Sequence, residues 1–238
     1  MLNNLCAGFF TNLARIFSNS QYMGMIFEGL WCTILISLGA SVVGIILGTL
    51  VAIVKIVPSK NPVMRVLNVV CDVYTTVFRG TPMALQLFIM AFVIFAIRGF
   101  PMEIVAILAF GINSGAYVSE SIRAGILSVD KGQMEAGRAV GLNYSKTMSK
   151  IIIPQAIKNV IPSIGNEIIA LIKETSIVSM VGGLYDLTLV AKIIGGGNEL
   201  ANFLAPMFVV ALFYLAIVYS LTFIIKLIER RLRASDNR

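Results

Sequence analysis

Residues 29–54 read GLWCTILISLGASVVGIILGTLVAIV, a run of 26 residues without a charged side chain. A helix rises about 1.5 Å per residue, so this run is long enough to cross the hydrocarbon layer of a bilayer, which is roughly 30 Å thick. The stretch therefore predicts a transmembrane helix.

The composition of the whole chain supports a membrane protein. Of its 238 residues, 58% are hydrophobic and 13% are charged, which is typical of a protein solvated by lipid. The chain has no histidine, which excludes histidine acid–base catalysis and histidine metal ligation. Its cysteines, Cys6, Cys32 and Cys71, are scattered without metal-ligand spacing. A soluble enzyme is therefore not the expected class.

Further apolar stretches complete the predicted architecture. Residues 200–225 form a second run of 26 uncharged residues, which a basic cluster ends. Less uniform spans are expected at about 63–97, 102–125 and 158–180, the first of them broken near Gly80, Thr81 and Pro82. The sequence thus predicts an all-α membrane protein with about five transmembrane helices.

The positions of the cations predict the orientation of these spans. Of the 19 Lys and Arg residues, 14 follow span one, lie between spans three and four, or follow span five; Lys60 and Arg238 are among them. Short cytoplasmic loops hold most Lys and Arg in membrane proteins. We therefore expect the N-terminus outside the cell and the C-terminus in the cytoplasm, with the basic tail acting as a topology signal.

Three segments follow from this topology. Residues 1–27 form an N-terminal outer segment, residues 28–230 a transmembrane domain with a cytoplasmic loop at 126–158, and residues 231–238 a basic cytoplasmic tail. Apolar residues recur at near-helical spacing in the first segment, which predicts a short helix on the outer membrane interface. These residues are Phe9, Phe10, Leu13, Ile16 and Phe17.

The cytoplasmic loop contains a pattern typical of two short helices. Met134–Val140 is rich in helix formers, and Gly141 can adopt the left-handed conformation that ends a helix. Asn143 can cap the next helix, and Pro154 suits the first turn of another. The pattern predicts a compact elbow whose small residues allow a partner to approach closely. An ordinary solvated connector is the alternative that these residues leave open.

The elbow resembles the EAA motif of permease subunits of bacterial ABC importers. Two size-conservative departures, Gly137 for Ala and Ile153 for Leu, do not disturb the match. In that family the loop is a coupling helix seated in a groove of the nucleotide-binding subunit. The resemblance therefore implies a role in ATPase coupling for Glu135, Ala136, Gly137, Gly141 and Pro154.

Other motifs resemble the polar amino acid permeases of the histidine/glutamine/arginine type. They are FRGTP at 78–82, GAYVSE at 115–120, GNE at 165–167 and KETS at 173–176. The resemblance covers about residues 23–230. It implies the type I ABC importer permease fold, a multi-pass location in a bacterial inner membrane, and a transport subunit rather than an enzyme.

The energy source is expected to lie in a partner, because the chain has no G-x-x-x-x-G-K-[ST] phosphate-binding motif. We expect two copies of an ABC ATPase subunit, which would bind ATP and Mg, while this chain itself needs no cofactor. A second permease, identical or homologous, and an extracytoplasmic amino acid binding protein are also implied. Membrane lipid surrounds the assembly, and no nucleic acid partner is expected.

Ionisable residues within the spans are candidates for substrate contact, because a charge in the membrane is costly unless it is paired or hydrated. Arg79 or Lys173 is expected to meet the carboxylate of an amino acid, and Glu120 or Glu167 its ammonium. Pro82 should free backbone groups around Arg79 and Thr81 for a ligand. The candidate substrate-binding residues are Arg79, Thr81, Gln86, Asn113, Tyr117, Glu120, Asn166, Glu167 and Lys173.

Two structural alternatives apply to the same charges. Arg79 could pair with Asp72, and Lys173 with Glu174 or Glu167, as contacts that hold the bundle together. The ionisable set contains four acids and two bases, which favours a cationic amino acid as substrate.

Two other functions fit the sequence less well than an ABC permease does. An ion-coupled secondary transporter would use Glu120, Asp72 and Glu167 as a relay, but such transporters usually contain two repeated halves, which this chain lacks. A membrane-embedded enzyme is disfavoured because the sequence has no nucleophile–base arrangement.

Overall fold

The computed structural model describes residues 2–58, 61–197 and 203–234, and within these ranges the chain is helical with no strand. The expectations that concern Lys60 and Arg238 lie outside the described residues. The elements are α1 Leu2–Ser18, α2 Ser20–Ile56, α3 Pro62–Gly80, α4 Met83–Ile89, η1 Met90–Ile94, α5 Met102–Leu127, α6 Lys131–Ala139, α7 Tyr144–Thr147, η2 Met148–Ile152, α8 Ile153–Glu174, η3 Thr175–Met180, α9 Leu187–Gly196 and α10 Leu204–Ala234.

The predicted spans correspond to these helices. In the described part of the chain α2, α5 and α10 are long and apolar enough to cross a membrane, and α3 joined to α4–η1 adds a fourth span if that bent pair is counted as one. The bend between the two parts is 110°, at the break predicted for residues 80–82. The predicted span 158–180 corresponds to α8 and η3, and α8 packs against α5, α10 and α2.

One element boundary differs from the sequence prediction. The predicted cytoplasmic loop 126–158 is mostly helical, and α8 already begins at Ile153, because Pro154 occupies its first turn and needs no N–H partner there. Glycines also lie inside a helix, since Gly195 and Gly196 form the last turn of α9. Packing of α9 against α2 and α10 outweighs the low helix propensity of glycine.

Glycines set a close and extensive contact between α2 and α5. A Cβ atom at Gly48 would lie 2.7 Å from Cβ of Val118, and one at Gly111 would lie 2.6 Å from Cβ of Val43. Gly44 with Gly48 and Gly111 with Gly115 form two small-xxx-small patterns that face each other, which is how membrane helices bring their backbones together. The α2–α5 pair is thus the centre of the bundle.

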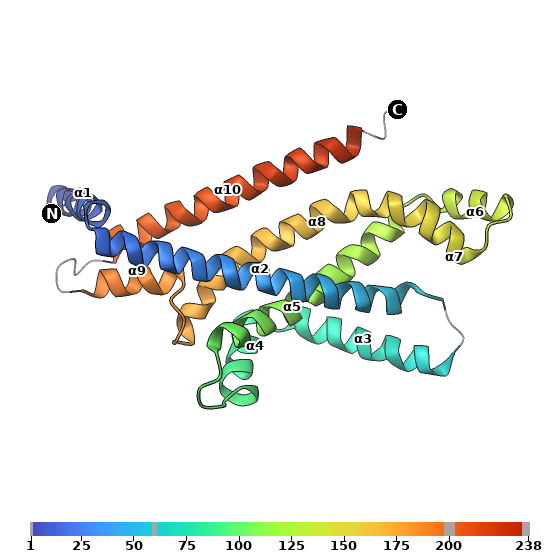
Figure 1. Cartoon of the computed structure of the whole chain (residues 1–238), viewed down its shortest axis with the longest axis horizontal. Helices are drawn as coiled ribbons and strands as arrows, with labels where there is room; N and C mark the ends of the chain where they lie inside the picture. The colour runs from blue at the N-terminus through green and yellow to red at the C-terminus, as the bar shows by residue number, and fades with distance from the viewer. Residues whose placement is uncertain (1, 59–60, 198–202, 235–238) are drawn as a thin grey trace.

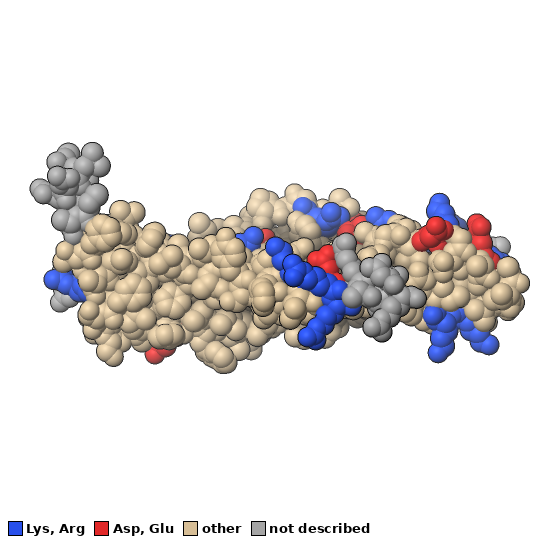
Figure 2. Space-filling view, turned by 90° about the horizontal axis from the view of Figure 1, so that it is seen from above, with Lys and Arg blue, Asp and Glu red and all other residues tan. Residues whose placement is uncertain are grey.

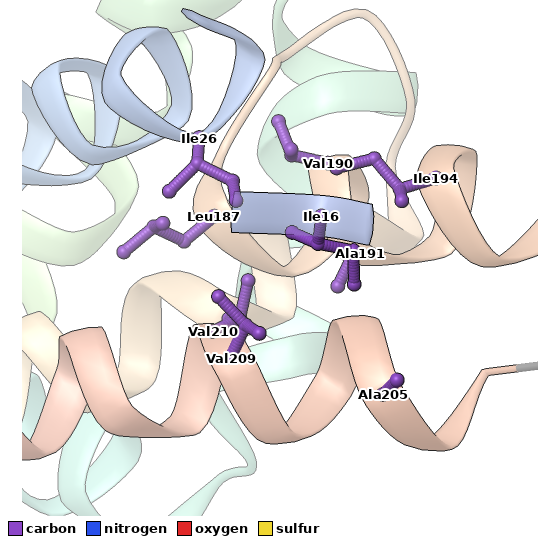
Figure 3. Packing of buried hydrophobic residues seen from close by; sticks show 9 residues of the cluster. All are labelled: Ile16, Ile26, Leu187, Val190, Ala191, Ile194, Ala205, Val209 and Val210. Carbon is purple, nitrogen blue, oxygen red and sulfur yellow. The ribbon is translucent and has the colours of Figure 1, made fainter. Parts of the chain in front are cut away.

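A second core cluster lies where α1, α9 and the starts of α2 and α10 meet (Figure 3). The predicted N-terminal helix forms as α1, and Ile16 is fully buried in this cluster, whereas Phe10 and Phe17 are exposed. The helix therefore packs on the bundle through one side. The cluster consists of Ile16, Ile26, Leu187, Val190, Ala191, Ile194, Ala205, Val209 and Val210.

The molecule is elongated, with α1 and α9 at one end and α6 and α7 at the other (Figure 1). We call the second the elbow end; there α2 ends and α3 begins. The face shown in Figure 2 carries most of its charged side chains over the half toward the elbow end, and few charged side chains over the other half. This distribution matches the charge asymmetry read from the sequence.

Candidate functional site

The elbow has the local structure that its sequence predicts. Asp130 caps α6 by accepting a hydrogen bond from Gly132 N at 2.6 Å. Gly141 has φ +85° and ends that helix, and Asn143 caps α7 by accepting from Lys146 N at 2.9 Å. These turns confirm the predicted compact pair of helices.

Gly137 serves the inside of the elbow. It is buried, and a Cβ atom on it would lie 2.5 Å from the Cγ2 atom of Thr147. Its small size lets α6 close on α7, so the close approach that it allows lies within the elbow, and its role in ATPase coupling stays a prediction. Glu135, Ala136 and Val140 remain exposed, and the Val140 side chain is 77% exposed.

Two amide side chains donate hydrogen bonds to backbone carbonyls at the break after α3. Gln86 Nε2 donates to Phe78 O at 2.9 Å and to Thr81 Oγ1 at 2.7 Å, and Asn113 Nδ2 donates to Phe78 O at 3.1 Å and to Gln86 Oε1 at 2.9 Å. Gln86 Nε2 also lies 3.2 Å from Thr81 O. The carbonyls of Phe78 and Thr81, two of the backbone groups at the break, therefore already have partners in the amides of Gln86 and Asn113, as buried polar groups require.

The hydrogen bonds of Gln86 and Asn113 limit what three predicted substrate residues can offer a ligand. Thr81, Gln86 and Asn113 do lie together, but the N–H groups of both amides already have acceptors within the protein. Their evident effect is to fix the bend, and with it the direction of the adjacent Arg79.

Arg79 lies at the end of α3 and is exposed. Its guanidinium carbon stands 5.4 Å from the centre of the Tyr117 ring, within the range of a cation–π contact. The alternative in which Arg79 pairs with Asp72 is wrong, because Asp72 binds Lys55. Arg79 therefore retains donors that can face a carboxylate.

A network of charges joins α2, α3 and α5 near the elbow end. Lys55 Nζ lies 3.0 Å from Asp72 Oδ1 and 2.7 Å from Glu120 Oε1. The second oxygen of Glu120 accepts from Arg123 Nη2 at 2.9 Å and from Arg123 Nε at 3.0 Å. Both oxygens of the Glu120 carboxylate are thus held by cations of the protein.

A polar hollow of about 690 Å³ opens between the end of α3, the second half of α5 and α8. Three predicted residues meet there: Arg79, Tyr117 and Glu120. Neutral polar side chains complete the lining, and the sequence analysis missed them. Asn159 and Ser163 share a face of α8 with Asn166, which was predicted, and this spacing of four and three was the signal available. The lining consists of Arg79, Tyr117, Glu120, Ser121, Ala124, Gly125, Ser128, Asn159 and Ser163.

The remaining predicted residues lie farther along α8, outside the lining of this hollow. Asn166 and Lys173 are exposed on one face, and Glu167 and Glu174 are half-buried on another, as the helical spacing predicted. In the described ranges neither Glu167 nor Glu174 forms an ion pair with Lys173. The alternative in which these pairs hold the bundle together is therefore wrong.

The charge network also removes the argument for a cationic substrate. Asp72 and Glu120 are two of the four acids in the ionisable set, but the structure neutralises them with Lys55 and Arg123. Neither cation was in the counted set, because Lys55 lies at the end of the first span and Arg123 near the end of the third. The remaining acids and bases are equal in number, so the count favours no charge class.

Asp186 is a buried carboxylate that the sequence analysis did not single out. It is fully buried and caps α9, accepting from Thr188 N at 2.9 Å and from Leu189 N at 3.1 Å. The stretch that it precedes, LTLV, is apolar, and an Asp before such a run is a known sign of a helix start. Its contacts give it a structural role at the end of the bundle opposite the elbow.

The chain is similar to known proteins over most of its length. A family model described as "binding-protein-dependent transport system inner membrane component" matches residues 44–234. The arginine transport system permease protein ArtQ of Bacillus subtilis (strain 168) is 41% identical over 213 residues, which cover 89% of this chain and 94% of that protein. The putative glutamine transport system permease protein GlnP of Rickettsia bellii (strain RML369-C) is 43% identical over 212 residues, which cover 88% and 94%.

Solved structures show the same architecture. A chain of the crystal structure of an amino acid ABC transporter with histidines superposes with a TM-score of 0.82 at 35% identity, covering 91% of this chain and 98% of that chain. The MetNI methionine ABC transporter in an inward-facing conformation gives a TM-score of 0.72 at 18% identity, covering 90% and 99%, and shares the fold.

Proposed function

The chain belongs to the family of binding-protein-dependent transport system inner membrane components, and we propose that it forms the passage for polar amino acids in an ATP-driven uptake system. It is a membrane-spanning permease subunit, and ATP hydrolysis belongs to a separate subunit. The named relatives, permeases for arginine and glutamine, support an amino acid as the substrate class.

The assembly that we propose has two copies of this permease, or this permease with a homologous one, two ATPase subunits and an external binding protein. Residues 28–230 form the permease domain, and the elbow end faces the cytoplasm, with the N-terminus outside and the basic tail of residues 231–238 inside. The exposed side chains of the elbow, among them Glu135, Ala136 and Val140, support docking of an ATPase there.

The hollow beside Arg79 is the part of the passage that we assign to this chain. Arg79 offers a charged donor for the carboxylate of an amino acid, and Tyr117 holds the guanidinium in place. Ser121, Asn159 and Ser163 add neutral donors and acceptors that suit a polar side chain. Asn166, Glu167 and Lys173 extend the polar lining along α8, and Lys173 is the second candidate for the carboxylate.

The observation that carries this function is the elbow itself, a short helix pair with a fixed turn at Gly141. Closure of the ATPase subunits would displace the elbow and the helices joined to it, so that the hollow opens to one side and then to the other. The permease needs no cofactor of its own in this scheme, since Mg and ATP are bound by the partner.

The experiment compares two glycines that have the same left-handed backbone conformation. The permease, its ATPase and its binding protein are reconstituted in proteoliposomes, and uptake of L-amino acids is measured per ATP hydrolysed. Gly141→Val forces a branched residue to φ +85° in the elbow, and we expect the ratio to fall roughly tenfold. Gly99→Val places the same strain at φ +82° in the loop before α5 and should keep the ratio.

Equal ratios in the two variants would overturn the coupling role of the elbow. Competition by a panel of unlabelled amino acids in the same vesicles identifies the substrate. Accumulation by this chain alone on a proton or sodium gradient would instead favour the ion-coupled transporter.

A further inference from the structure

Lys55 is a charged residue in the last turn of α2 that the family match and the predicted site both leave without a role. Its side chain is only 12% exposed. An ammonium so placed is costly unless it is paired, and Lys55 is paired with two carboxylates, one from α3 and one from α5. It also lies 3.4 Å from Thr75 Oγ1 on α3. Three helices thus converge on one nitrogen atom.

The network lies between two spaces. On one side is the polar hollow, whose lining includes Glu120. On the other is a cavity of about 320 Å³ between the bundle and the elbow, whose lining includes Lys55, Arg123, Met134, Tyr144 and Met148. Glu120 therefore lines the hollow, while the two cations that bind it, Lys55 and Arg123, line the cavity next to the elbow.

The path from the elbow to this network is short and stiff. α5 carries Glu120 and Arg123 and continues without a break to Leu127, and α6 begins at Lys131. Asn159 at the start of α8 donates to Ser128 Oγ at 2.9 Å, which ties the joint to a second helix. A displacement of the elbow therefore acts first on the end of α5.

We propose that Lys55 is a positioning residue for transport: it clamps Asp72 and Glu120, and so passes movement of the elbow through α5 to the helices that border the hollow. The inference rests on the proposed function, because it assigns one of its steps to a residue. Lys55 touches neither substrate nor nucleotide in this scheme. It keeps three helices moving as one unit at the elbow end.

The test uses the complete reconstituted complex and three variants. Lys55→Met removes the clamp, and we expect uptake per ATP hydrolysed to fall roughly tenfold while the ATPase continues to turn over. Lys55→Arg keeps a cation that can reach both carboxylates and should stay within about twofold of the wild type. Lys55→Met with Asp72→Asn restores the balance of charge without the clamp, and it should remain as poorly coupled as Lys55→Met.

The double variant separates positioning from simple neutralisation of charge. If it recovers the wild-type ratio, Lys55 serves only to neutralise charge, and the proposal fails. Wild-type coupling in Lys55→Met would overturn it equally. Where Lys55→Met does not assemble, Asp72→Asn alone is the second test: the Asp72 side chain is 64% exposed, so this variant should fold, and it should lower the ratio about threefold.

An unchanged ratio in Asp72→Asn would likewise contradict the clamp. The proposed function has its own, separate failure: a wild-type complex without uptake that depends on ATP and on the binding protein. In that case the permease role is lost whatever the variants do. When the wild type is active, only the variants decide the role of Lys55.

Discussion

The most apolar windows of α2 and α10 have equal mean hydropathy but very different burial. In their most apolar windows, 39% of the residues of α2 are buried within the chain, against 11% for α10. The difference follows from small residues: Gly44 and Gly48 let α5 approach α2 closely, whereas α10 presents large apolar side chains outward. Apolarity thus predicts that a helix enters the membrane, and side-chain size predicts which helix it meets there.

The largest expected effect comes from adding bulk between α2 and α5. Gly48→Leu would place a Cβ atom 2.8 Å from the carbonyl oxygen of Gly115, a backbone atom that cannot move alone. We expect a loss of more than about 3 kcal/mol of stability, seen as a large fall in the melting temperature of permease purified in detergent.

Gly24→Leu is the matched control on the same helix. Nothing lies within 4 Å of a Cβ atom there, so this variant should melt like the wild type. Equal losses in the two variants would show that glycine itself, and not the contact with α5, determines the effect.

The second expected effect compares one aromatic residue from each region. Phe110 on α5 is fully buried, whereas Phe223 on α10 is 69% exposed. Phe110→Ala leaves a cavity in the core and should cost about 3 kcal/mol. Phe223→Ala should change stability by less than about 0.5 kcal/mol. A large loss in Phe223→Ala would mean that a partner subunit covers α10, which thermal melting of the complex and of the single chain would separate.

The smallest effect concerns two serines. Ser114 Oγ on α5 is buried near the Glu167 carboxyl but makes no hydrogen bond of ordinary geometry among the described residues, whereas Ser220 Oγ on the exposed α10 donates to Ala216 O at 2.7 Å. Ser114→Ala removes an unsatisfied hydroxyl and should leave stability unchanged or raise it by up to about 1 kcal/mol. Ser220→Ala should be neutral. A clear loss in Ser114→Ala, measured by melting, would show that the hydroxyl has a partner in the assembled transporter.

The order of the helices and the position of the break between α3 and α4 could be predicted from the sequence. Uncharged runs located α2 and α10, and Pro82 located the break after α3, because both signals depend on local chemistry. The turn at Gly141 and the cap at Asn143 were predicted for the same reason. Paired glycines on α2 and α5 were also present in the sequence, but their meeting depends on two helices far apart in the chain.

The site was less predictable, because its charges are paired between helices. Arg79, Tyr117 and Glu120 were found as polar residues within spans, and they do meet. Lys55 was missed as a partner because it ends an apolar run, where a lysine is usually a topology signal. Gln86 and Asn113 donate hydrogen bonds to a carbonyl of another helix. Helical spacing could not predict these bonds, because it relates residues within one helix only.

The small buried share of α10 has a consequence for biosynthesis. Helix α10 is translated after the other helices, and the glycine-lined contact between α2 and α5 can close as soon as residue 127 has left the ribosome. The nascent chain can therefore reach a stable centre early and add its final membrane segment from the lipid side, without reopening what has already packed.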